Sequence, residues 1–445
     1  MKKYLGGLSH LLMTVFLHNF SIFIVIPSMT DVTMSALCPG MEECSLAIYL
    51  TAFQEAITGL GTLVMMPLMG NLSDKYGRKA LLTFPMTLTI IPLAILAYSR
   101  KRNYFYVYYV VKTLTSMICE GSVHCLSLAY LADCVPEGRR ASAFGILSGI
   151  GSAAFVCGTL SARFLSTVST FQVAVSVAIV ATVYMRVFLD DSVMGEASLS
   201  TPILSKGKDD AGSGSATCTI EENLDDGSQF FKPMPSLGDM VSLLKSSGTF
   251  SQAAGVAFFS SLADFGLYAS LMYYLKARFF FNKDQFADLM VISGIAGTIS
   301  QLGLMPFLAP VLGEAKLLSV ALLFSCIHMF LYSVAWASWV PYIAAMLSFL
   351  SVFSQPCMRS IVSKQVGSCE QGKAQGCISG ICSFAHVISP LAFSPLTALF
   401  LSERAPFHFP GFSIMCVGFA AMIAFIQSTL IRTPPPKPSC DFMVA

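Results

Sequence analysis

The stretch Gly70-Asn71-Leu72-Ser73-Asp74-Lys75-Tyr76-Gly77-Arg78-Lys79 separates two long apolar segments, near residues 46–69 and 80–98. Each segment approaches the roughly 20 apolar residues that an α-helix needs to cross a bilayer. The charges of the stretch lie between the two segments. The pattern therefore predicts two membrane helices joined by a short charged loop at the membrane surface.

The composition of the whole chain favours the same environment. Apolar residues make up 55% of the 445 residues and charged residues only 12%, whereas about 25% of the residues of a soluble domain are charged. So few charges could not cover the surface in water, and much of that surface must face lipid. The net charge of +2 and the lack of a basic stripe in the sequence give no reason to expect a nucleic-acid partner.

Apolar segments of similar length recur along the chain between polar breaks, and we count about twelve. They are continuous rather than alternating, which favours helices over the strands of a membrane barrel. The first set lies near 5–29, 46–69, 80–98, 104–131, 141–164 and 168–189, and the second near 249–276, 285–312, 315–334, 338–362, 375–400 and 410–431. The predicted fold class is an all-α integral membrane protein with about twelve transmembrane helices in two pseudo-symmetric six-helix bundles.

The stretch between the two sets, residues 190–246, is rich in Asp, Glu, Lys, Gly and Ser. Low hydrophobicity with many charges is typical of a disordered segment. The predicted organisation is an N-terminal bundle over 1–189, a cytoplasmic disordered linker over 190–246, a C-terminal bundle over 247–434 and a cytoplasmic tail over 435–445.

A short internal repeat relates the two bundles. Ala143-Phe144-Gly145-Ile146-Leu147-Ser148-Gly149-Ile150 begins the fifth predicted helix, and Ala374-Gln375-Gly376-Cys377-Ile378-Ser379-Gly380-Ile381 begins the eleventh. Each copy contains Gly-x-x-x-Gly, a spacing that lets helix backbones approach closely in lipid. Parallel six-helix repeats are a known architecture of transporters.

Lysine and arginine residues predict the orientation, because cytoplasmic loops carry an excess of them. One side of the predicted topology holds Lys2, Lys3, Lys75, Arg78, Lys79, Arg139, Arg140, Arg359, Lys364 and Lys373. The basic groups at 100–102 and 276–283 fall on the other side and break the rule. We expect the first side, both termini and the linker in the cytoplasm. The expected location is the plasma membrane or an endomembrane such as the vacuole or lysosome.

The 14 cysteines show no metal-binding spacing, and most lie in apolar segments, where cysteine packs as a small apolar residue. Cys38 and Cys44 are exceptions, because they lie in a polar loop. If that loop faces an oxidising compartment, the two can form a disulfide; free thiols are the alternative. We expect no metal and no cofactor.

The opening stretch resembles the signature loop of the major facilitator superfamily, G-x-L-x-D-x-x-G-R-[KR], at every defining position. The resemblance implies conformational gating, not substrate contact, for Gly70, Asp74, Gly77, Arg78 and Lys79. Gly70 would let the second helix approach a neighbour, and Asp74 could interact with a helix N-terminus or a cation. A simple basic turn that anchors the loop is the alternative.

The loop after the fourth helix supplies two further cations of the gating motif, Arg139 and Arg140. They could join Asp74 in a cytoplasmic charge cluster, or they could lie in a solvated loop.

Segments 48–82 and 371–376 resemble the tetracycline-transporter-like and hippocampus-abundant-transcript-like branch of the superfamily. The fifth helix departs from the antiporters of that branch. Ala154 and Phe155 replace a Gly-Pro pair, and Cys157 replaces a glycine. This departure argues against simple drug/proton antiport.

Ionisable residues at the bilayer centre are costly, and they normally face a cavity or a partner. Asp264 lies in an apolar segment far from both ends of the seventh helix, and it shares one helical face with Ser261 and Tyr268. Its carboxylate could bind and release a proton, or Lys112 could hold it in an ion pair. Glu120 is the other candidate partner for Lys112.

The helices that line the central cavity in the superfamily, together with the second helix, carry further candidates: His18, Glu55, Lys112, Glu120 and His124. Glu120 and His124 are one turn apart and could meet on one helix. Interior hydrogen bonds are the alternative role for the two histidines, and a helix-end role is the alternative for Glu55.

These features predict a secondary active transporter that moves a small organic solute by alternating access, as a monomer in the lipid bilayer. Proton symport or antiport is an open alternative. The sequence has no nucleotide-binding Gly-x-x-x-x-Gly-Lys loop and no nucleophile constellation, so we expect no enzyme. A second hypothesis is a non-transporting membrane receptor or scaffold on the same fold, because a fold does not fix a function.

Overall fold

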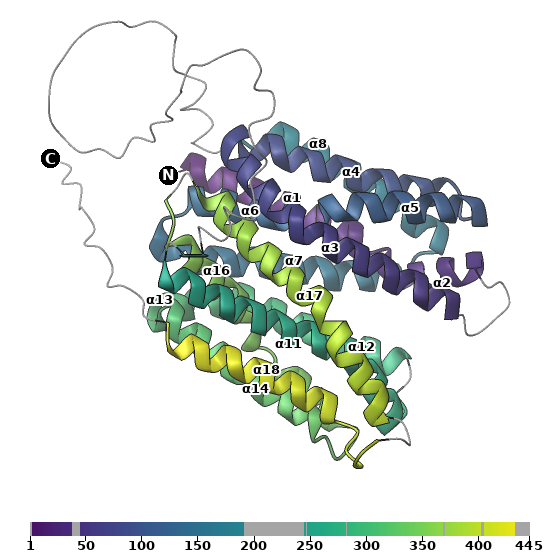
Figure 1. The fold of residues 1–445 in the computed structure, drawn as a ribbon. Coiled ribbons are helices and arrows are strands. Elements are labelled where there is room, and N and C mark those ends of the chain that lie inside the picture. The colour runs from purple at the N-terminus through teal and green to yellow at the C-terminus, as the bar shows by residue number, and fades with distance from the viewer. Residues whose placement is uncertain are drawn as a thin grey trace, which may run out of the picture.

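The computed structural model describes residues 2–37, 45–190, 244–245, 247–281, 283–367, 370–401 and 405–431. These residues form helices and connecting turns, and no strand occurs among them. Two groups of helices lie against each other, the purple-to-blue N-terminal half and the green-to-yellow C-terminal half (Figure 1).

The N-terminal half contains eight α-helices, because its first and fourth spans are each interrupted. The helices are α1 (Lys2–Phe23), α2 (Ile26–Leu37), α3 (Ser45–Tyr76), α4 (Arg78–Tyr98), α5 (Arg102–Cys119), α6 (Ser122–Cys134), α7 (Arg140–Ala162) and α8 (Thr167–Phe188). A single 3-10 turn, Glu137–Arg139, leads into α7.

The C-terminal half repeats this plan with breaks in its second and fourth spans. Its helices are α11 (Gly248–Phe279), α12 (Lys283–Ile299), the π-helical η2 (Ser300–Leu304), α13 (Met305–Leu312), α14 (Glu314–Ser333), α15 (Val340–Leu347), the 3-10 turn η3 (Ser351–Phe353), α16 (Ser354–Ser363), α17 (Gln371–Leu401) and α18 (Phe412–Thr429). These elements fall on the six segments that the sequence predicts for this half.

Eleven of the described segments are long and apolar enough to cross a membrane. The α5–α6 segment supplies the remaining predicted span; it is broken at Gly121 and carries Lys112 and Glu120. The all-α, multi-pass fold class is therefore confirmed. The Cys38–Cys44 loop, linker residues 191–243 and the tail 435–445 lie outside the described residues, and the predictions about them stay predictions.

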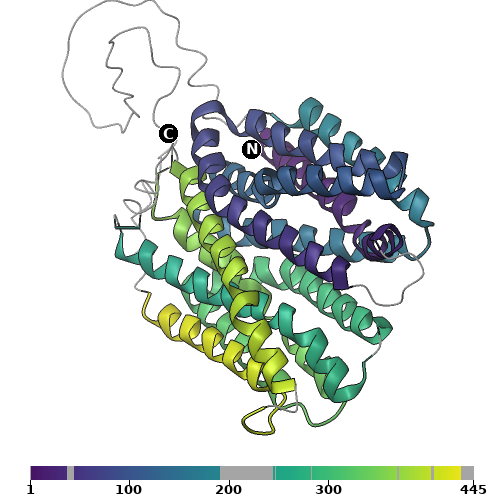
Figure 2. The ribbon, with the colours of Figure 1, turned by 45° about the vertical axis from the view of Figure 1, so that its right-hand side comes forward.

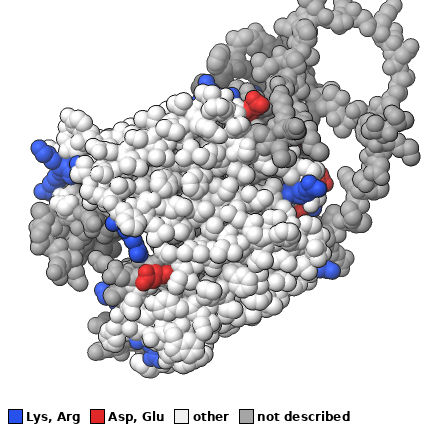
Figure 3. All heavy atoms as spheres, turned by 180° about the vertical axis from the view of Figure 1, so that it is seen from behind, with Lys and Arg blue, Asp and Glu red and all other residues white. Residues whose placement is uncertain are grey.

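The surface has the character that lipid requires. On the face seen in Figure 3, charged side chains gather at two opposite ends, and a broad band without charge lies between them. Large apolar side chains are exposed within the spans, for example Phe53, Leu60 and Val64 on α3. In water such a surface would promote aggregation, whereas in a bilayer it lies against the lipid chains.

Each half has its own apolar core. The N-terminal half packs around two clusters, centred on residues such as Phe144 and Phe171, and the C-terminal half around three. One residue crosses this division, because Ala141 of α7 joins the C-terminal cluster that contains Met305. The halves are thus separate packing units that touch along a few helices.

Helices α3 and α17 form the closest contact between the halves. They lie side by side at the end where α17 begins and diverge toward the other end (Figures 1 and 2). Glycines allow this approach, since a Cβ added at Gly70 would overlap the carbonyl oxygen of Gly372. The end of the bundle at which residues 70–79, 133–140, 363–367 and 370–373 meet is called the motif end below.

Both copies of the internal repeat lie in contacts between the halves. Gly376 and Gly380 of α17 pack on α3, whereas Gly145 and Gly149 of α7 pack on Met305 and Leu302. The repeated Gly-x-x-x-Gly spacing therefore serves equivalent helix contacts on the two sides of the molecule.

We expect Gly376→Ala to lower the thermal stability of the detergent-purified protein, because the added Cβ would lie 2.7 Å from the carbonyl oxygen of Met66. Overpacking of this kind costs about 1–3 kcal/mol. Gly303→Ala is the matched control, since a Cβ there meets nothing within 4 Å. Equal melting temperatures for the two variants would show that α3 and α17 are not held at this separation.

Candidate functional site

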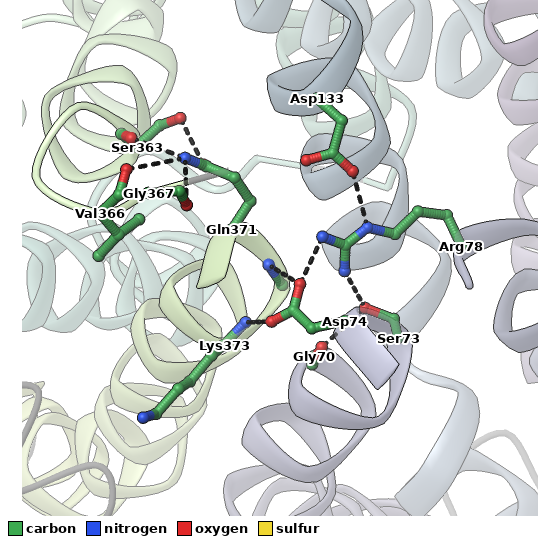
Figure 4. A network of polar contacts seen from close by, with 11 residues as sticks. Gly70, Ser73, Asp74, Arg78, Asp133, Ser363, Val366, Gly367, Gln371 and Lys373 are labelled. Carbon is green, nitrogen blue, oxygen red and sulfur yellow. Dashed lines mark hydrogen bonds and ion pairs between the residues drawn. The ribbon is translucent and has the colours of Figure 1, made fainter. Parts of the chain in front are cut away.

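Two buried acids and one buried arginine form a charge cluster at the motif end (Figure 4). Gly77 has a φ of +90°, a left-handed value that favours glycine, and this turn places Arg78 at the start of α4. The Arg78 guanidinium pairs with Asp74 of α3, and its Nε donates to Asp133 Oδ2 of α6 over 2.9 Å. We call Asp74, Arg78 and Asp133 the gate cluster.

Asp74 also binds the opposite half of the molecule. Its carboxylate accepts hydrogen bonds from the backbone N–H groups of Gly372, at 2.9 Å, and Lys373, at 2.7 Å. Both groups belong to the first turn of α17, where helix N–H groups have no intrahelical partner and the helix dipole is positive. A carboxylate of the N-terminal half therefore caps a helix of the C-terminal half.

The gate cluster differs from the predicted one in its members. Arg139 is exposed, and Arg140 is buried but donates to the carbonyl oxygens of Val135 and Ser363. In the described part of the chain neither arginine pairs with Asp74. The third member is Asp133, which approaches because α6 ends beside the first turn of α4.

The remaining motif residues frame the cluster without entering it. Gly70 makes the close approach to Gly372, and the Ser73 hydroxyl accepts a hydrogen bond from Arg78. Lys79 lies half-buried one residue beyond Arg78 on α4.

Asp264 lies near the middle of α11, on a face that is buried toward both helix ends. Ala257 and Ser261 are buried below it and Leu271 and Leu275 above it, whereas Asp264 itself is exposed. A face toward lipid would be exposed along its whole length. From this pattern of exposure we infer that the middle of this face borders a space inside the protein, which we call the inner cavity.

Tyr268 lies one turn from Asp264 on the same helix face and is 71% exposed. The third residue of the predicted face, Ser261, is buried at 2% and does not reach the inner cavity. On the neighbouring face, the ring of Phe265 stacks on His386 of α17 with centroids 4.0 Å apart.

Glu55 of α3 points away from lipid. Its face of the helix carries the buried Thr58 and Thr62, opposite the exposed Phe53 and Leu60. Glu55 itself is exposed and interacts electrostatically with Glu120 and Lys112, so we assign its carboxylate to the inner cavity as well. The predicted alternative of a helix-end role does not fit, because α3 begins ten residues earlier, at Ser45.

Glu120 lies at a break in the fourth span. Helix α5 ends at Cys119, Gly121 adopts a left-handed φ of +73°, and α6 begins at Ser122. Glu120 interacts electrostatically with Glu55 and with His386 of the other half, which places its exposed side chain between the halves.

Two pairings expected from the sequence are wrong. The prediction that Glu120 and His124 meet assumes an unbroken helix, and the turn at Gly121 redirects the chain between them. His124 interacts instead with Arg359 of α16.

The second wrong pairing is that of Lys112 with Asp264. Lys112 interacts with Glu55 and with the buried His18, both in its own half. No ion pair joins it to Asp264 or Glu120 in the described ranges. The cavity residues therefore fall into an N-terminal group around Lys112 and the separate carboxylate Asp264 of the other half.

Comparison with known proteins identifies the family. Residues 11–390 match the family model of the Major Facilitator Superfamily. The chain belongs to the major facilitator superfamily. As a member of this superfamily with a confirmed multi-pass helical fold, it is a membrane transporter.

Relatives of this major facilitator protein include the mouse protein named hippocampus abundant transcript 1 protein, 22% identical over 86% of this chain and 72% of the relative. The class E tetracycline resistance protein of Escherichia coli is 20% identical over 76% of each chain. Both belong to the branch whose motifs the sequence resembles, so the predicted relationship is confirmed.

Solved structures share the fold. The human organic anion transporter MFSD10 (TETRAN) superposes with a TM-score of 0.76 at 16% identity, over 96% of this chain and 99% of its own. The fucose:proton symporter of E. coli superposes with a TM-score of 0.68 at 12% identity, over 97% and 100% of the two chains. At these identities the likeness concerns the fold alone.

Proposed function

We propose that this protein is a secondary active transporter that moves a small organic solute by alternating access, as a monomer. The observation that carries the proposal is the bond between Asp74 and the first turn of α17. This contact joins the two halves at the motif end, beyond an inner cavity that holds ionisable groups from both halves. A contact of this kind is a natural gate for halves that rock about a central site.

The gate works through charge placed at a helix end. In the closed state the Asp74 carboxylate is stabilised by two N–H groups and by Arg78. Opening of the motif end breaks the two backbone bonds but leaves Asp74 paired with Arg78 in its own half. The cost of opening is therefore the loss of charge-assisted bonds of moderate strength, which substrate binding in the cavity can offset.

The proposal places the motif end in the cytoplasm. Glu137 is exposed at this end and Phe164 at the opposite end. We expect a cysteine introduced at position 137 to react with a membrane-impermeant maleimide only after cells are permeabilised, and a cysteine at 164 to react in intact cells. The reverse pattern would contradict the proposed orientation.

Proton coupling is the preferred energy source. The inner cavity holds three carboxylates, Glu55, Glu120 and Asp264. Glu55 interacts with Lys112, whereas Asp264 forms no ion pair in the described part of the chain. A carboxylate without a cationic partner in such a place can bind a proton on one side of the membrane and release it on the other.

A flux assay tests the whole proposal. Purified protein in proteoliposomes is screened against panels of labelled organic solutes, with and without an imposed pH gradient. We expect accumulation of at least one solute that the gradient drives and a protonophore abolishes. Specific solute binding without flux in any condition would favour the receptor hypothesis instead.

A further inference from the structure

The internal symmetry of the chain extends to the loops of the motif end. Gly77 and Gly313 both have positive φ values, +90° and +76°, and each lies directly before a helix, α4 and α14. Aligning these two glycines makes Glu314 the counterpart of Arg78. The counterpart of Asp74 is then Pro310, so the C-terminal half has no equivalent carboxylate at this position.

A second alignment comes from the repeat that begins at Ala143 and Ala374. Carried back along the chain, it makes Gln371 the counterpart of Arg140, and Lys364 the counterpart of Asp133. The local bonds agree with this correspondence. Arg140 Nε donates to the Val135 carbonyl over 3.3 Å, and Gln371 Nε2 donates to the Val366 carbonyl, its counterpart, over 3.2 Å.

The two alignments together reveal an ion pair with reversed charges. Arg78 pairs with Asp133 in one half, and their counterparts Glu314 and Lys364 pair over 2.9 Å in the other. Glu314 also accepts a hydrogen bond from Ser360 of α16 over 2.8 Å. The C-terminal pair therefore fixes the last turns of α16 against α14.

Arg140 contacts the helix end that this pair fixes. Its Nη1 donates over 3.1 Å to the carbonyl oxygen of Ser363, the last residue of α16. A helix C-terminus carries unpaired carbonyls and the negative end of the dipole, so it attracts a cation. The N-terminal half thus binds both sides of one corner, with Arg140 on the end of α16 and Asp74 on the start of α17.

The corner between α16 and α17 is itself tied together. Ser363 Oγ donates to Gln371 Oε1 over 2.6 Å, and Gln371 Nε2 donates back to the Ser363 carbonyl over 2.9 Å (Figure 4). A force on one helix end is therefore transmitted to the other.

We propose that Arg140 forms a second gate contact, and that Glu314 and Lys364 are positioning residues which hold the end of α16 for it. The proposal rests on the proposed gating function and extends it. Asp74 and Arg140 bind two helix ends that the Ser363–Gln371 bonds join, so the two contacts open and close together as one unit.

Labelling of Cys125 provides a test that needs no substrate. This thiol is fully buried on α6, where it contacts Ser379 of α17 across the halves. Opening of the motif end would expose it to a maleimide added to that side of sealed membranes, with the labelled site identified by mass spectrometry.

We expect Arg140→Gln to raise the labelling rate by roughly 5-fold or more, and Arg140→Lys to raise it less. A glutamine at position 140 can still donate to the Val135 carbonyl, as Gln371 donates to the Val366 carbonyl. Its side chain is shorter than that of arginine and does not reach the Ser363 carbonyl.

A charge exchange tests the positioning residues. We expect Glu314→Lys and Lys364→Glu each to raise Cys125 labelling, and the double exchange to lower the rate again toward that of the wild type. Recovery should be incomplete, because Glu314 also interacts electrostatically with Arg140. A purely space-filling role would give no recovery. Glu370→Gln is the control and should label at the wild-type rate, because Glu370 is exposed and its 3.9 Å pair with Lys373 lies within the C-terminal half. A double exchange that labels like the single variants would overturn the positioning role.

The same assay separates this proposal from the gating function on which it rests. If Asp74→Asn raises labelling and Arg140→Gln does not, the second contact is wrong and the first gate stands. If neither variant raises labelling, the gating function itself is wrong. If both contacts hold the same pair of helix ends, their effects on labelling should not be independent. The Asp74→Asn/Arg140→Gln double variant should then raise the labelling rate by less than the product of the two single-variant increases.

Discussion

Replacement of Asp74 by asparagine is expected to lower the maximal transport rate by roughly 5–150-fold, the range of typical coupling energies, with little change in KM. Asparagine keeps the shape of the side chain but loses the charge that the first turn of α17 and Arg78 both stabilise. Asp74 lies at the motif end, away from the inner cavity, so substrate affinity should be retained. The measurement is initial uptake into proteoliposomes over a range of solute concentrations.

The control for this experiment is Lys75→Gln. Lys75 is adjacent in the sequence but exposed, and its ammonium lies over the Tyr76 ring rather than in the gate cluster. It should transport at the normal rate. A normal rate for Asp74→Asn would refute the gate, and a change confined to KM would move Asp74 into the substrate site.

Arg78 is a poorer probe of the same gate. Its removal would leave Asp74 and Asp133 buried without a cation, and breaking a buried ion pair costs about 3–5 kcal/mol. A loss of transport would then be confounded with a loss of folded protein. The neutral substitution at Asp74 leaves the Arg78–Asp133 pair in place.

The fold could be predicted because the bilayer enforces it. A span must be long, apolar and helical, so hydropathy alone places segments such as 80–98, which the structure begins only two residues earlier, at Arg78. The signature loop also predicted that Asp74 interacts with a helix N-terminus or a cation, and the structure shows both, in the first turn of α17 and in Arg78.

The partners of these residues across the molecule could not be predicted in the same way. Asp74 binds Gly372 and Lys373, almost three hundred residues away, and no local pattern encodes how two bundles dock. For the same reason the sequence offered Arg139 and Arg140 as members of the gate cluster, although Asp133 was equally close in the chain. The repeat around Gly145 and Gly376 was the one long-range signal in the sequence, and when it is carried back into the preceding loop it matches Lys364 to Asp133. The match of Glu314 to Arg78 needs the glycine turns at Gly77 and Gly313, which only the structure shows.

The break in the fourth span explains why a pairing predicted from helical spacing was wrong. Glu120 and His124 satisfy the spacing of neighbours on an intact helix, but the left-handed Gly121 lies between them. A glycine at that place was the available signal, because few other residues adopt this conformation without strain. Lys112 and Asp264 were paired because both of their helices were expected to line the central cavity, but the structure gives Lys112 its neighbours in its own half.

The separation of Asp264 from Lys112 alters what its substitution should do. In an ion pair with Lys112, Asp264→Asn would strand a buried cation and destabilise the protein. Since no such pair exists and Asp264 is exposed to the inner cavity, we expect the asparagine variant to reach the membrane in normal amounts. Addition of Lys112→Gln should bring no rescue, and the two effects should add.

Transport by Asp264→Asn is expected to lose its response to an imposed pH gradient, with accumulation falling by roughly tenfold or more, within the usual range of coupling energies. Exchange of labelled for unlabelled solute at equal concentrations should persist, because that exchange requires no net proton movement. Tyr268→Phe, on the same exposed face, is the control and should keep its response to the gradient. If Asp264→Asn still accumulates solute against its gradient, the coupling proton is carried elsewhere, and Glu55 and Glu120 become the next carboxylates to replace. If exchange is lost together with accumulation while membrane insertion is normal, Asp264 contacts the solute itself and the role of a pure proton carrier is wrong.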